Sequence, residues 1–290
     1  MATHPLLRAF QARTPAFGAW IQLPSPFIAR AVAQASPHLS WVLIDCEHGL
    51  TSLQPGCAET IQAIQAGGGS GSGSGYGAGG AGKSDVKGGQ APSVVVRIPA
   101  TGPSDSVGWQ IKYALDAGAR GVLVPMVSTP EQATAVAAAS RFPPLGIRGL
   151  GSPFASQAWG LAPFAYVGAA NTDVQVMVQI ETQEAVQNVK EIAETPGIDV
   201  LFIGPFDLSM ALGLPPPFPV PGPALEAVLA QVLDAAHAAG KKCGIYCAGG
   251  KAAAQRAAQG FDMISVTTDY DALTAGVAGQ LRVASEKAAL

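Results

Sequence analysis

Short apolar runs rich in β-branched residues recur along the chain and alternate with segments of helical periodicity. Eight such runs lie at Phe17–Leu23, Trp41–Glu47, Ser93–Pro99, Gly121–Val127, Val174–Glu181, Val200–Pro205, Lys242–Cys247 and Met263–Thr268. Continuous apolar runs are typical of parallel strands that are buried on both faces. Eight units of strand followed by helix predict a single (β/α)₈ barrel, or TIM barrel, with a doubly wound open sheet as the alternative.

The segments between these runs have the apolar spacing of helices. The expected helices are Leu6–Ala12, Phe27–Ala35, residues 51–66, Ser104–Ala117, Pro130–Ser140, Gln183–Glu194, Ala224–Ala239, a segment that ends at Ala258, and Tyr270–Glu286. Residues Phe142 to Thr172 are expected to form a long irregular stretch, and loops of that length inside a compact domain are usually functional.

The composition changes abruptly at residues 67–90, where glycine and serine dominate. This tract is expected to be a flexible insertion between the second helix and the third strand, so that residues 1–290 form one domain. Residues 77–84 match the phosphate-binding P-loop pattern and residues 75–80 match the dinucleotide fingerprint. Both motifs need a strand before them and a helix after them, and neither is present here. No nucleotide is therefore expected to bind.

The overall charge and hydropathy argue against several classes of function. The formal net charge is −3 and 13% of the residues are charged, so the chain has no basic footprint for nucleic acid or an anionic membrane. No apolar stretch is long enough to span a bilayer, and the first residues lack the apolar core of a signal peptide. The four cysteines, Cys46, Cys57, Cys243 and Cys247, form no zinc or disulfide pattern. A cytoplasmic protein is expected.

Carboxylates mark the ends of the fifth and sixth runs, as Glu181 and Asp207. Residues just past the C-terminal ends of parallel strands meet on the active-site side of a barrel. Two carboxylates placed there can bind one hard divalent cation such as Mg²⁺ or Mn²⁺. The competing interpretation is that each residue caps a helix, as acidic residues often do.

Other polar residues are expected at the same end. His48 is a candidate general base beside a metal-bound water, and Arg97 needs an anion if it is buried. Gln179 lies two residues before Glu181 and therefore on the same side of its strand. Each has a structural interpretation as well: His48 as a capping or surface residue, Arg97 as a salt-bridge partner, and Asp45 as an interior charge paired with Arg97. Their gathering at one end of one barrel favours a catalytic site.

Several longer motifs resemble one known family. They are IDCEHG (residues 44–49), VVVRIP (94–99), KYALDAGARGVLVPMVSTPEQA (112–133), FPPLGIRGLG (142–151), VQIET (178–182) and FIGPFDLSMALG (202–213). In this order, and over residues 17–273 apart from the glycine-rich tract, they resemble the HpcH/HpaI aldolase family. That family contains metal-dependent class II aldolases that act on pyruvate-derived hydroxy-oxo acids on a pyruvate-type TIM barrel.

The resemblance implies a role for each matching residue. Glu181 and Asp207 match the metal ligands, His48 matches the catalytic base, and Asp116 matches the acidic partner of that base. Further positions implied to meet the substrates are Arg97 at the bound oxo acid, Gln179, Pro205 and Ser152 in the same site, and Asp45 near the second substrate.

The implied reaction is cleavage of a hydroxy-oxo acid to pyruvate and an aldehyde. A divalent metal, Mg²⁺, Mn²⁺ or Co²⁺, acts as a Lewis acid and stabilises the enolate, so that no lysine Schiff base is needed. An oxaloacetate-type decarboxylase or a related carbon–carbon lyase could use the same enolate. A third alternative is a binding protein that kept the barrel and lost the chemistry, but the intact His48, Arg97, Glu181 and Asp207 argue against it.

The apolar pattern of the closing segment, residues 270–290, bears on whether the protein forms oligomers. Its apolar residues are close to helical spacing, so one face should be buried; they are Leu273, Val277, Leu281 and Val283. In the resembled family the last helix packs on a neighbouring subunit, which implies a homo-oligomer, a hexamer built from helix-swapped dimers. Asp45 could then serve the active site of a neighbour.

The chain departs from the family pattern at four places. The glycine-rich insertion interrupts the segment that leads to Arg97, Cys46 stands where a glycine is common, and residues 153–174 and 214–223 match less well. Loops such as these usually shape the choice of substrate.

Overall fold

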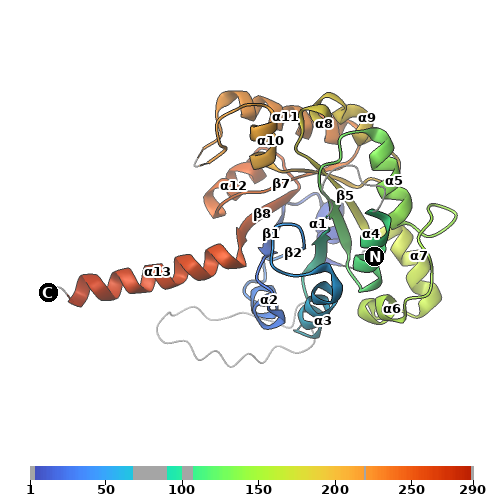
Figure 1. The fold of residues 1–290 in the computed structure, drawn as a ribbon, viewed down its shortest axis with the longest axis horizontal. Helices are drawn as coiled ribbons and strands as arrows, with labels where there is room; N and C mark the ends of the chain where they lie inside the picture. The colour runs from blue at the N-terminus through green and yellow to red at the C-terminus, as the bar shows by residue number, and fades with distance from the viewer. Residues whose placement is uncertain (1–3, 68–89, 100–106, 219, 289–290) are drawn as a thin grey trace.

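The computed structural model describes residues 4–67, 90–99, 107–218 and 220–288, and its eight parallel strands form a closed barrel (Figure 1). The strands are β1 (Ala16–Ile21), β2 (Trp41–Asp45), β3 (Ser93–Arg97), β4 (Gly121–Val124), β5 (Gln175–Ile180), β6 (Val200–Ile203), β7 (Lys242–Ile245) and β8 (Met263–Thr268). Each strand pairs with the next along the chain, and β8 pairs with β1, where Met263 lies opposite Ala16. This closure confirms the predicted (β/α)₈ barrel and excludes an open sheet.

Helices surround the barrel. They are α1 (Pro5–Ala12), α2 (Pro26–Ala33), α3 (Ala58–Ala66), α4 (Val107–Asp116), α5 (Pro130–Ser140), α6 (Pro153–Trp159), α7 (Pro163–Asp173), α8 (Gln183–Gln187), α9 (Val189–Glu194), α10 (Pro205–Ala211), α11 (Pro223–Ala238), α12 (Gly250–Ala258) and α13 (Asp269–Ala288), with a kinked turn, η1 (Leu53–Cys57), before α3 in which Gln54 is extended. Many begin at a capping side chain followed by proline, as α5 does at Thr129 and Pro130. The predicted helix Gln183–Glu194 is split into α8 and α9 at Asn188.

The barrel interior is packed by large side chains set against glycines. A Cβ on Gly18 would lie 2.0 Å from the ring of Trp41, which pairs with it in the sheet. A Cβ on Gly244 would likewise lie 2.4 Å from the ring of Phe202 on the adjacent strand. The strands can therefore keep both rings fully buried only because these two positions carry no side chain.

The two ends of the barrel receive different parts of the chain. Loops that follow strands lie at the C-terminal end, whereas the helices run back and deliver the chain to the N-terminal end, where the next strand starts. Helix α1 lies at the N-terminal end, since Leu6 and Phe10 join the interior cluster and His4 bonds Ser93 at the start of β3. The residues that end α4 and follow α5 belong to that end as well.

The expected irregular stretch Phe142–Thr172 contains two helices, α6 and α7, so this prediction was wrong. Helix α6 starts at Ser152, whose side chain accepts a hydrogen bond from the N–H of Ala155, and α7 starts at Pro163. Their sequences are rich in small residues and lack a clear apolar period, which is why the pattern did not reveal them. The predicted insertion at residues 67–90 falls mostly on residues 68–89, which lie outside the described part of the chain, and stays a prediction.

None of the helices in the described ranges is both long and apolar enough to cross a membrane. The four cysteines are buried and free. The two in strand β7 and just after it behave as small apolar residues of the core.

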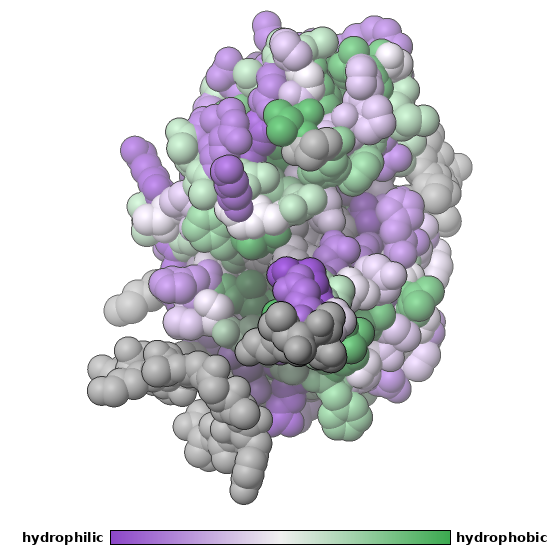
Figure 2. All heavy atoms as spheres, turned by 90° about the vertical axis from the view of Figure 1, so that its left-hand side faces the viewer, coloured by the Kyte–Doolittle hydropathy of each residue, from purple (hydrophilic) through white to green (hydrophobic). Residues whose placement is uncertain are grey.

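Helix α13 departs from the barrel pattern. It follows β8 and projects away from the barrel instead of lying along it (Figure 1). Its apolar residues are about half exposed; they are Tyr270, Leu273, Val277, Leu281 and Val283. Figure 2 views the molecule from the side toward which this helix projects, and apolar surface is visible beside it.

Candidate active site

A pocket of about 300 Å³ opens at the C-terminal end of the barrel. It is lined by Trp20, Gln22, His48, Arg97, Gln179, Phe202, Gly204, Pro205, Phe206, Asp207 and Tyr246. The pocket thus brings together five residues singled out from the sequence, namely His48, Arg97, Gln179, Pro205 and Asp207. Their elements are distant in sequence, and the parallel barrel places the ends of these strands side by side.

Glu181 lies beneath this pocket as the first residue after β5, and it is 2% exposed. One of its carboxylate oxygens accepts a 2.8 Å hydrogen bond from the backbone N–H of Met126. Met126 follows β4 in the left-handed region, with φ 58°, which is uncommon outside glycine. Burial, together with the nearby charge of Asp207, raises the pKa of Glu181 to about 7 in spite of the Met126 hydrogen bond. A cation beside this carboxylate would therefore stabilise it.

Gln179 and Gly204 shape the space next to Glu181. The amide of Gln179 donates to a carboxylate oxygen of Glu181. The other amide atom, Oε1, is buried and has no hydrogen-bond partner among the residues that the structure describes. A Cβ on Gly204 would come within 2.4 Å of Glu181 Oε2 and 2.6 Å of Gln179 Nε2. Glycine at this position therefore keeps the surroundings of both polar groups open.

Arg97, at the end of β3, is held by two carboxylates. Its Nε and Nη2 donate to Asp45 at 2.9 and 2.8 Å, and its Nη1 lies 3.0 Å from Glu47 Oε2. The guanidinium also stacks over the ring of Trp20 at 4.4 Å. Although burial acts in the opposite direction, the bonds from Arg97 hold the pKa of Asp45 below its ordinary value. Asp45 is fully buried and paired with Arg97, the interior position that the sequence left open, and its implied place near a second substrate stays a prediction.

His48 lies at the mouth of the pocket, and its side chain is 60% exposed. Its Nε2 is 3.7 Å from Glu47 Oε2. Burial raises the pKa of Glu47 to about 7 against the effect of Arg97, and the charges of Glu181, Asp45 and Asp207 act in the same direction as burial. Glu47 therefore lies next to both Arg97 and His48, and its charge interacts with those of Glu181 and Asp207.

Asp116 and Ser152 are not part of this pocket, contrary to the roles that the resemblance implied. Asp116 ends α4, at the N-terminal end of the barrel, where its carboxylate pairs with Lys112 and Arg148. Ser152 caps α6, and its hydroxyl donates to the backbone carbonyl of Asp116. Both follow helices that have run back from the active-site end, so neither can reach His48 of the same chain.

Four residues in or beside the pocket had no predicted role. Glu47, which lies beside the pocket against Arg97 and His48, was expected only as the end of the second strand, and the lining residues Trp20, Phe206 and Tyr246 were given no function. A signal was available, because each of them lies near the C-terminal end of a strand or in the segment that follows one. Their mutual contacts, however, depend on side-chain packing between distant elements.

The donor set fits a divalent cation. Glu181 and Asp207 supply carboxylate oxygens, the ligands that Mg²⁺ and Mn²⁺ prefer, and Gln179 Oε1 is an additional oxygen nearby. Within the described ranges, no group of three or more His, Cys, Asp or Glu residues converges closely enough to hold a metal ion by itself. Two carboxylates leave most of an octahedral shell to water and substrate, which is how Mg²⁺ is usually bound.

Proteins of known type resemble this chain in sequence and in fold. A 4-hydroxy-2-oxovalerate aldolase of Novosphingobium aromaticivorans is 42% identical over 68% of this chain and 63% of its own length. A 4-hydroxy-2-oxo-heptane-1,7-dioate aldolase of Salmonella arizonae is 35% identical over 92% of this chain and 89% of its own. An HpcH/HpaI aldolase/citrate lyase family protein from Burkholderia cenocepacia has 31% sequence identity to this chain. Its crystal structure matches the present structure with a TM-score of 0.79 over 97% of this chain and 98% of that chain.

The model of the HpcH/HpaI aldolase/citrate lyase family matches residues 84–275. The chain therefore belongs to this family, as its motifs and its barrel indicated. It is a class II pyruvate aldolase, a carbon–carbon lyase that cleaves hydroxy-oxo acids to pyruvate and an aldehyde.

Proposed function

We propose that Glu181 and Asp207 hold a divalent cation and that Arg97, Gln179 and His48 act on a hydroxy-oxo acid bound beside it. One observation supports this most strongly. Glu181 is buried with its pKa raised to about 7 next to Asp207, at the foot of a pocket that contains the other three residues. A fold has no structural reason to bury unneutralised carboxylates, and such groups are frequent at functional sites.

Arg97 and Gln179 bind and orient the oxo acid in this proposal. A divalent cation, Mg²⁺, Mn²⁺ or Co²⁺, would supply Lewis acidity to the carboxylate and keto oxygens of the substrate. Arg97 faces the same pocket with a guanidinium fixed by Asp45 and Glu47, so it stabilises negative charge that develops on the keto oxygen without having to reorganise. Gln179 contributes an amide whose Oε1 has no other partner in the described chain.

His48 moves the proton. The bond between C3 and C4 of the substrate breaks when the C4 hydroxyl loses its proton, and the electron pair stays with the three-carbon fragment. His48, exposed at the mouth of the pocket, accepts the hydroxyl proton, and return of that proton to C3 of the three-carbon fragment completes pyruvate and restores neutral His48. Within one chain, the carboxylate beside His48 is Glu47 and not Asp116, so Glu47 is the residue that orients the imidazole.

The test is pyruvate release with and without metal. Chelator-treated protein should release no pyruvate from 4-hydroxy-2-oxo acids, and Mg²⁺, Mn²⁺ or Co²⁺ should restore it. Oxaloacetate belongs in the same panel, since preference for it over every hydroxy-oxo acid would favour the decarboxylase. Full turnover in excess chelator, with borohydride trapping a lysine adduct, would contradict the proposal.

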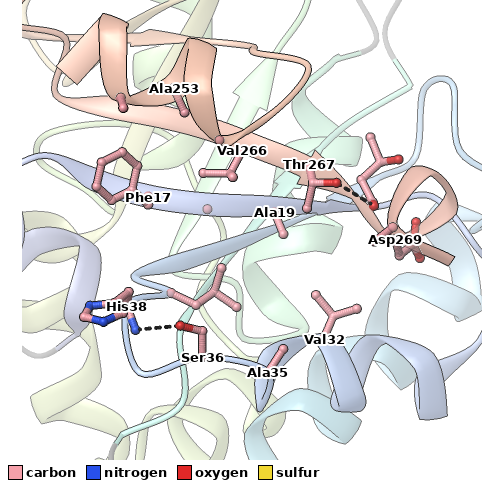
Figure 3. Close-up of a pocket in the computed structure, with 16 residues that line it drawn as sticks. Phe17, Ala19, Val32, Ala35, Ser36, His38, Ala253, Val266, Thr267 and Asp269 are labelled. Carbon is pink, nitrogen blue, oxygen red and sulfur yellow. Dashed lines mark hydrogen bonds between the residues drawn. The ribbon is translucent and has the colours of Figure 1, made fainter. Parts of the chain in front are cut away.

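The protein is further proposed to be a homo-oligomer in which α13 docks on a second copy. Tyr270, Leu273, Val277 and Leu281 share one face of α13 and are each more than half exposed in a single chain. An apolar groove of about 450 Å³ lies outside β1 and β8, between α2 and α12, and is lined by Phe17, Ala19, Val32, Ala253 and Val266 among others (Figure 3).

This groove is where a helix that follows β8 would ordinarily cover the barrel. Because α13 leaves it uncovered, the α13 of a second copy is the segment with matching chemistry, and an exchange buries both apolar faces. A hexamer built from such dimers is the expected assembly. If Asp116 acts on His48 at all, it must come from another copy, because the two lie at opposite ends of one barrel.

Mass measurement in solution tests the assembly, together with two variants of α13. The double variant Val277→Arg and Leu281→Arg should dissociate the oligomer, while Ala275→Arg on the far face of the helix should leave it intact. A stable, fully active monomer would contradict the arrangement, and so would truncation at Asp269 that left both oligomer and activity unchanged.

A further inference from the structure

Five aromatic side chains, hereafter the aromatic wall, run from the floor of the catalytic pocket to its rim. Trp20 contacts Phe202 with ring centroids 6.1 Å apart and Tyr246 at 5.4 Å, nearly perpendicular. Tyr246 contacts Phe218 at 6.4 Å, and Phe218 contacts Phe206 at 4.6 Å. All of them except Phe218 line the pocket itself. The pocket therefore has one continuous aromatic side.

The wall changes character from floor to rim. Trp20 and Phe202 are 2% and 0% exposed and belong to the barrel interior, so their packing alone explains them. Phe206, in contrast, is 51% exposed on α10, directly before Asp207. Phe218 supports it from the segment Leu214–Phe218, which contains three prolines and therefore has few backbone conformations. A ring held at the rim without burial by the core is available to a ligand.

The charges of the pocket limit what that ligand can be. Arg97 is the one arginine or lysine that lines the described pocket, and its guanidinium is already bound by Asp45 and Glu47. In the proposed function, the divalent cation is taken up by Glu181, Asp207 and the oxo-acid half of the substrate. A carboxylate on the aldehyde half would therefore meet no cation without other partners and would lie near the carboxylate of Glu47. An uncharged and flat group meets neither penalty.

We propose that the aldehyde half of the substrate is an uncharged aryl group that packs on Phe206 and Tyr246, with Phe218 holding Phe206 in place. This inference rests on the proposed function, since it needs the oxo-acid half to lie at Arg97 and Gln179. Aromatic pairs favour offset or edge-to-face contacts at centroid distances of about 4.5–7 Å, the range found within the wall itself. The substrate class is thus a 4-aryl-4-hydroxy-2-oxobutanoate.

Three substrates that differ at C4 test the proposal. They are 4-hydroxy-2-oxo-4-phenylbutanoate, 4-hydroxy-2-oxopentanoate and 4-hydroxy-2-oxo-heptane-1,7-dioate, which release benzaldehyde, acetaldehyde and a carboxylated aldehyde. The kcat/KM for pyruvate release from the phenyl substrate should exceed that from the dioate by at least about tenfold, the scale that hydrophobic pockets achieve. An equal or higher kcat/KM for the dioate would overturn the aryl subsite.

Variants of the rim residues test which side chains cause the preference for the phenyl substrate. Phe206→Ala and Phe218→Ala should each lower the ratio of kcat/KM for the phenyl substrate to that for the pentanoate by about tenfold. The control Phe164→Ala removes a ring that is 87% exposed on α7, and it should leave this ratio unchanged. An equal loss for all substrates would overturn the role of the rim residues.

The same assays separate the two proposals. Pyruvate from the pentanoate or the dioate, without a preference for the phenyl substrate, overturns the aryl subsite and leaves the proposed function standing. No pyruvate from any of the three substrates in the presence of metal overturns the proposed function itself.

Discussion

The two ends of the barrel both bury charged side chains, but they balance them differently. At the C-terminal end, four carboxylates, those of Asp45, Glu47, Glu181 and Asp207, surround the single guanidinium of Arg97. Burial and mutual repulsion raise the pKa values of Glu47 and Glu181 to about 7. This end therefore carries more negative charge than the described chain neutralises.

The N-terminal end is neutralised by the protein itself. Asp116 accepts from Arg148, which is 2% exposed, and also pairs with Lys112. The guanidinium of Arg148 lies 4.4 Å from the ring of Phe142, so the surplus positive charge meets an aromatic face. His4 is buried and bonds the Ser93 hydroxyl and the Asp173 carbonyl.

The comparison separates structural charges from functional ones. At the N-terminal end the fold supplies partners for Asp116, Arg148 and His4, so these groups need nothing from outside. Where it gathers carboxylates without enough cations, an external cation completes the site, and stability is given up for function.

The largest expected effect follows from removing one carboxylate at the C-terminal end. Glu181→Gln should lower kcat/KM for pyruvate release by more than about a thousandfold, because a bound metal supplies several kcal/mol of charge stabilisation. In metal-free protein at pH 8 the same variant should be more stable to urea by about 1–3 kcal/mol, since the wild-type pKa of about 7 lies above the ordinary 4.5 and ionisation at pH 8 opposes folding. A less stable metal-free variant would contradict the surplus of negative charge.

The next effect tests the space beside the two polar groups. Gly204→Ala places a Cβ within 2.4 Å of Glu181 Oε2 and should lower kcat/KM by about a hundredfold through misplacement of the carboxylate. Gly222→Ala is the matched control, because a Cβ there meets nothing within 4 Å. Steady-state kinetics with saturating Mn²⁺ would distinguish them, and equal activity of both variants would show that the geometry around Glu181 is not critical.

The smallest effect lies at the N-terminal end and has the opposite dependence on pH. Burial lowers the pKa of His4 from 6.5 to about 4, so the folded state holds it neutral. Above pH 6.5 His4 is neutral in both states, and the unfolding free energy is not reduced. As the pH falls from 6.5 toward 4 the unfolding free energy decreases, because only the unfolded state binds the proton. Between pH 7 and pH 4.5, the unfolding free energy of the wild type should therefore decrease by about 2 kcal/mol more than that of His4→Gln. The exposed His38→Gln serves as the control, and identical acid sensitivity of wild type and His4→Gln would remove His4 from this account.

Much of the fold could be predicted because the sequence pattern is local. Each β strand is a continuous apolar run, and the parallel barrel then fixes which residues share an end without any knowledge of side-chain contacts. His48, Arg97, Gln179 and Asp207 were placed in one pocket by this rule alone. The helices α6 and α7 were missed because their small residues show no period.

The roles implied for Asp116 and Ser152 do not fit their places within a single chain, and the reason is different. Asp116 lies in a motif that matches the family and Ser152 directly follows another, and such a match transfers a role without saying which end of the barrel a residue occupies. The direction of helix α4 places Asp116 at the N-terminal end, so topology limits what the motif implies for a single chain. The aromatic wall could not be predicted, because Phe206, Phe218 and Tyr246 meet through side-chain packing that no local pattern shows, and Tyr246 comes from a different strand–helix unit.

Metal binding to three proteins tests the central claim most directly, namely that the carboxylates of the C-terminal end hold a divalent cation. Calorimetric titration with Mn²⁺ would compare wild type, Glu181→Gln and Glu184→Gln, the last being an exposed carboxylate three residues further on in α8. Wild type and Glu184→Gln should bind one Mn²⁺ per chain with similar affinity, while Glu181→Gln should bind at least about a hundredfold more weakly. Equal affinity of all three proteins, or no Mn²⁺ binding by wild type, would contradict the account.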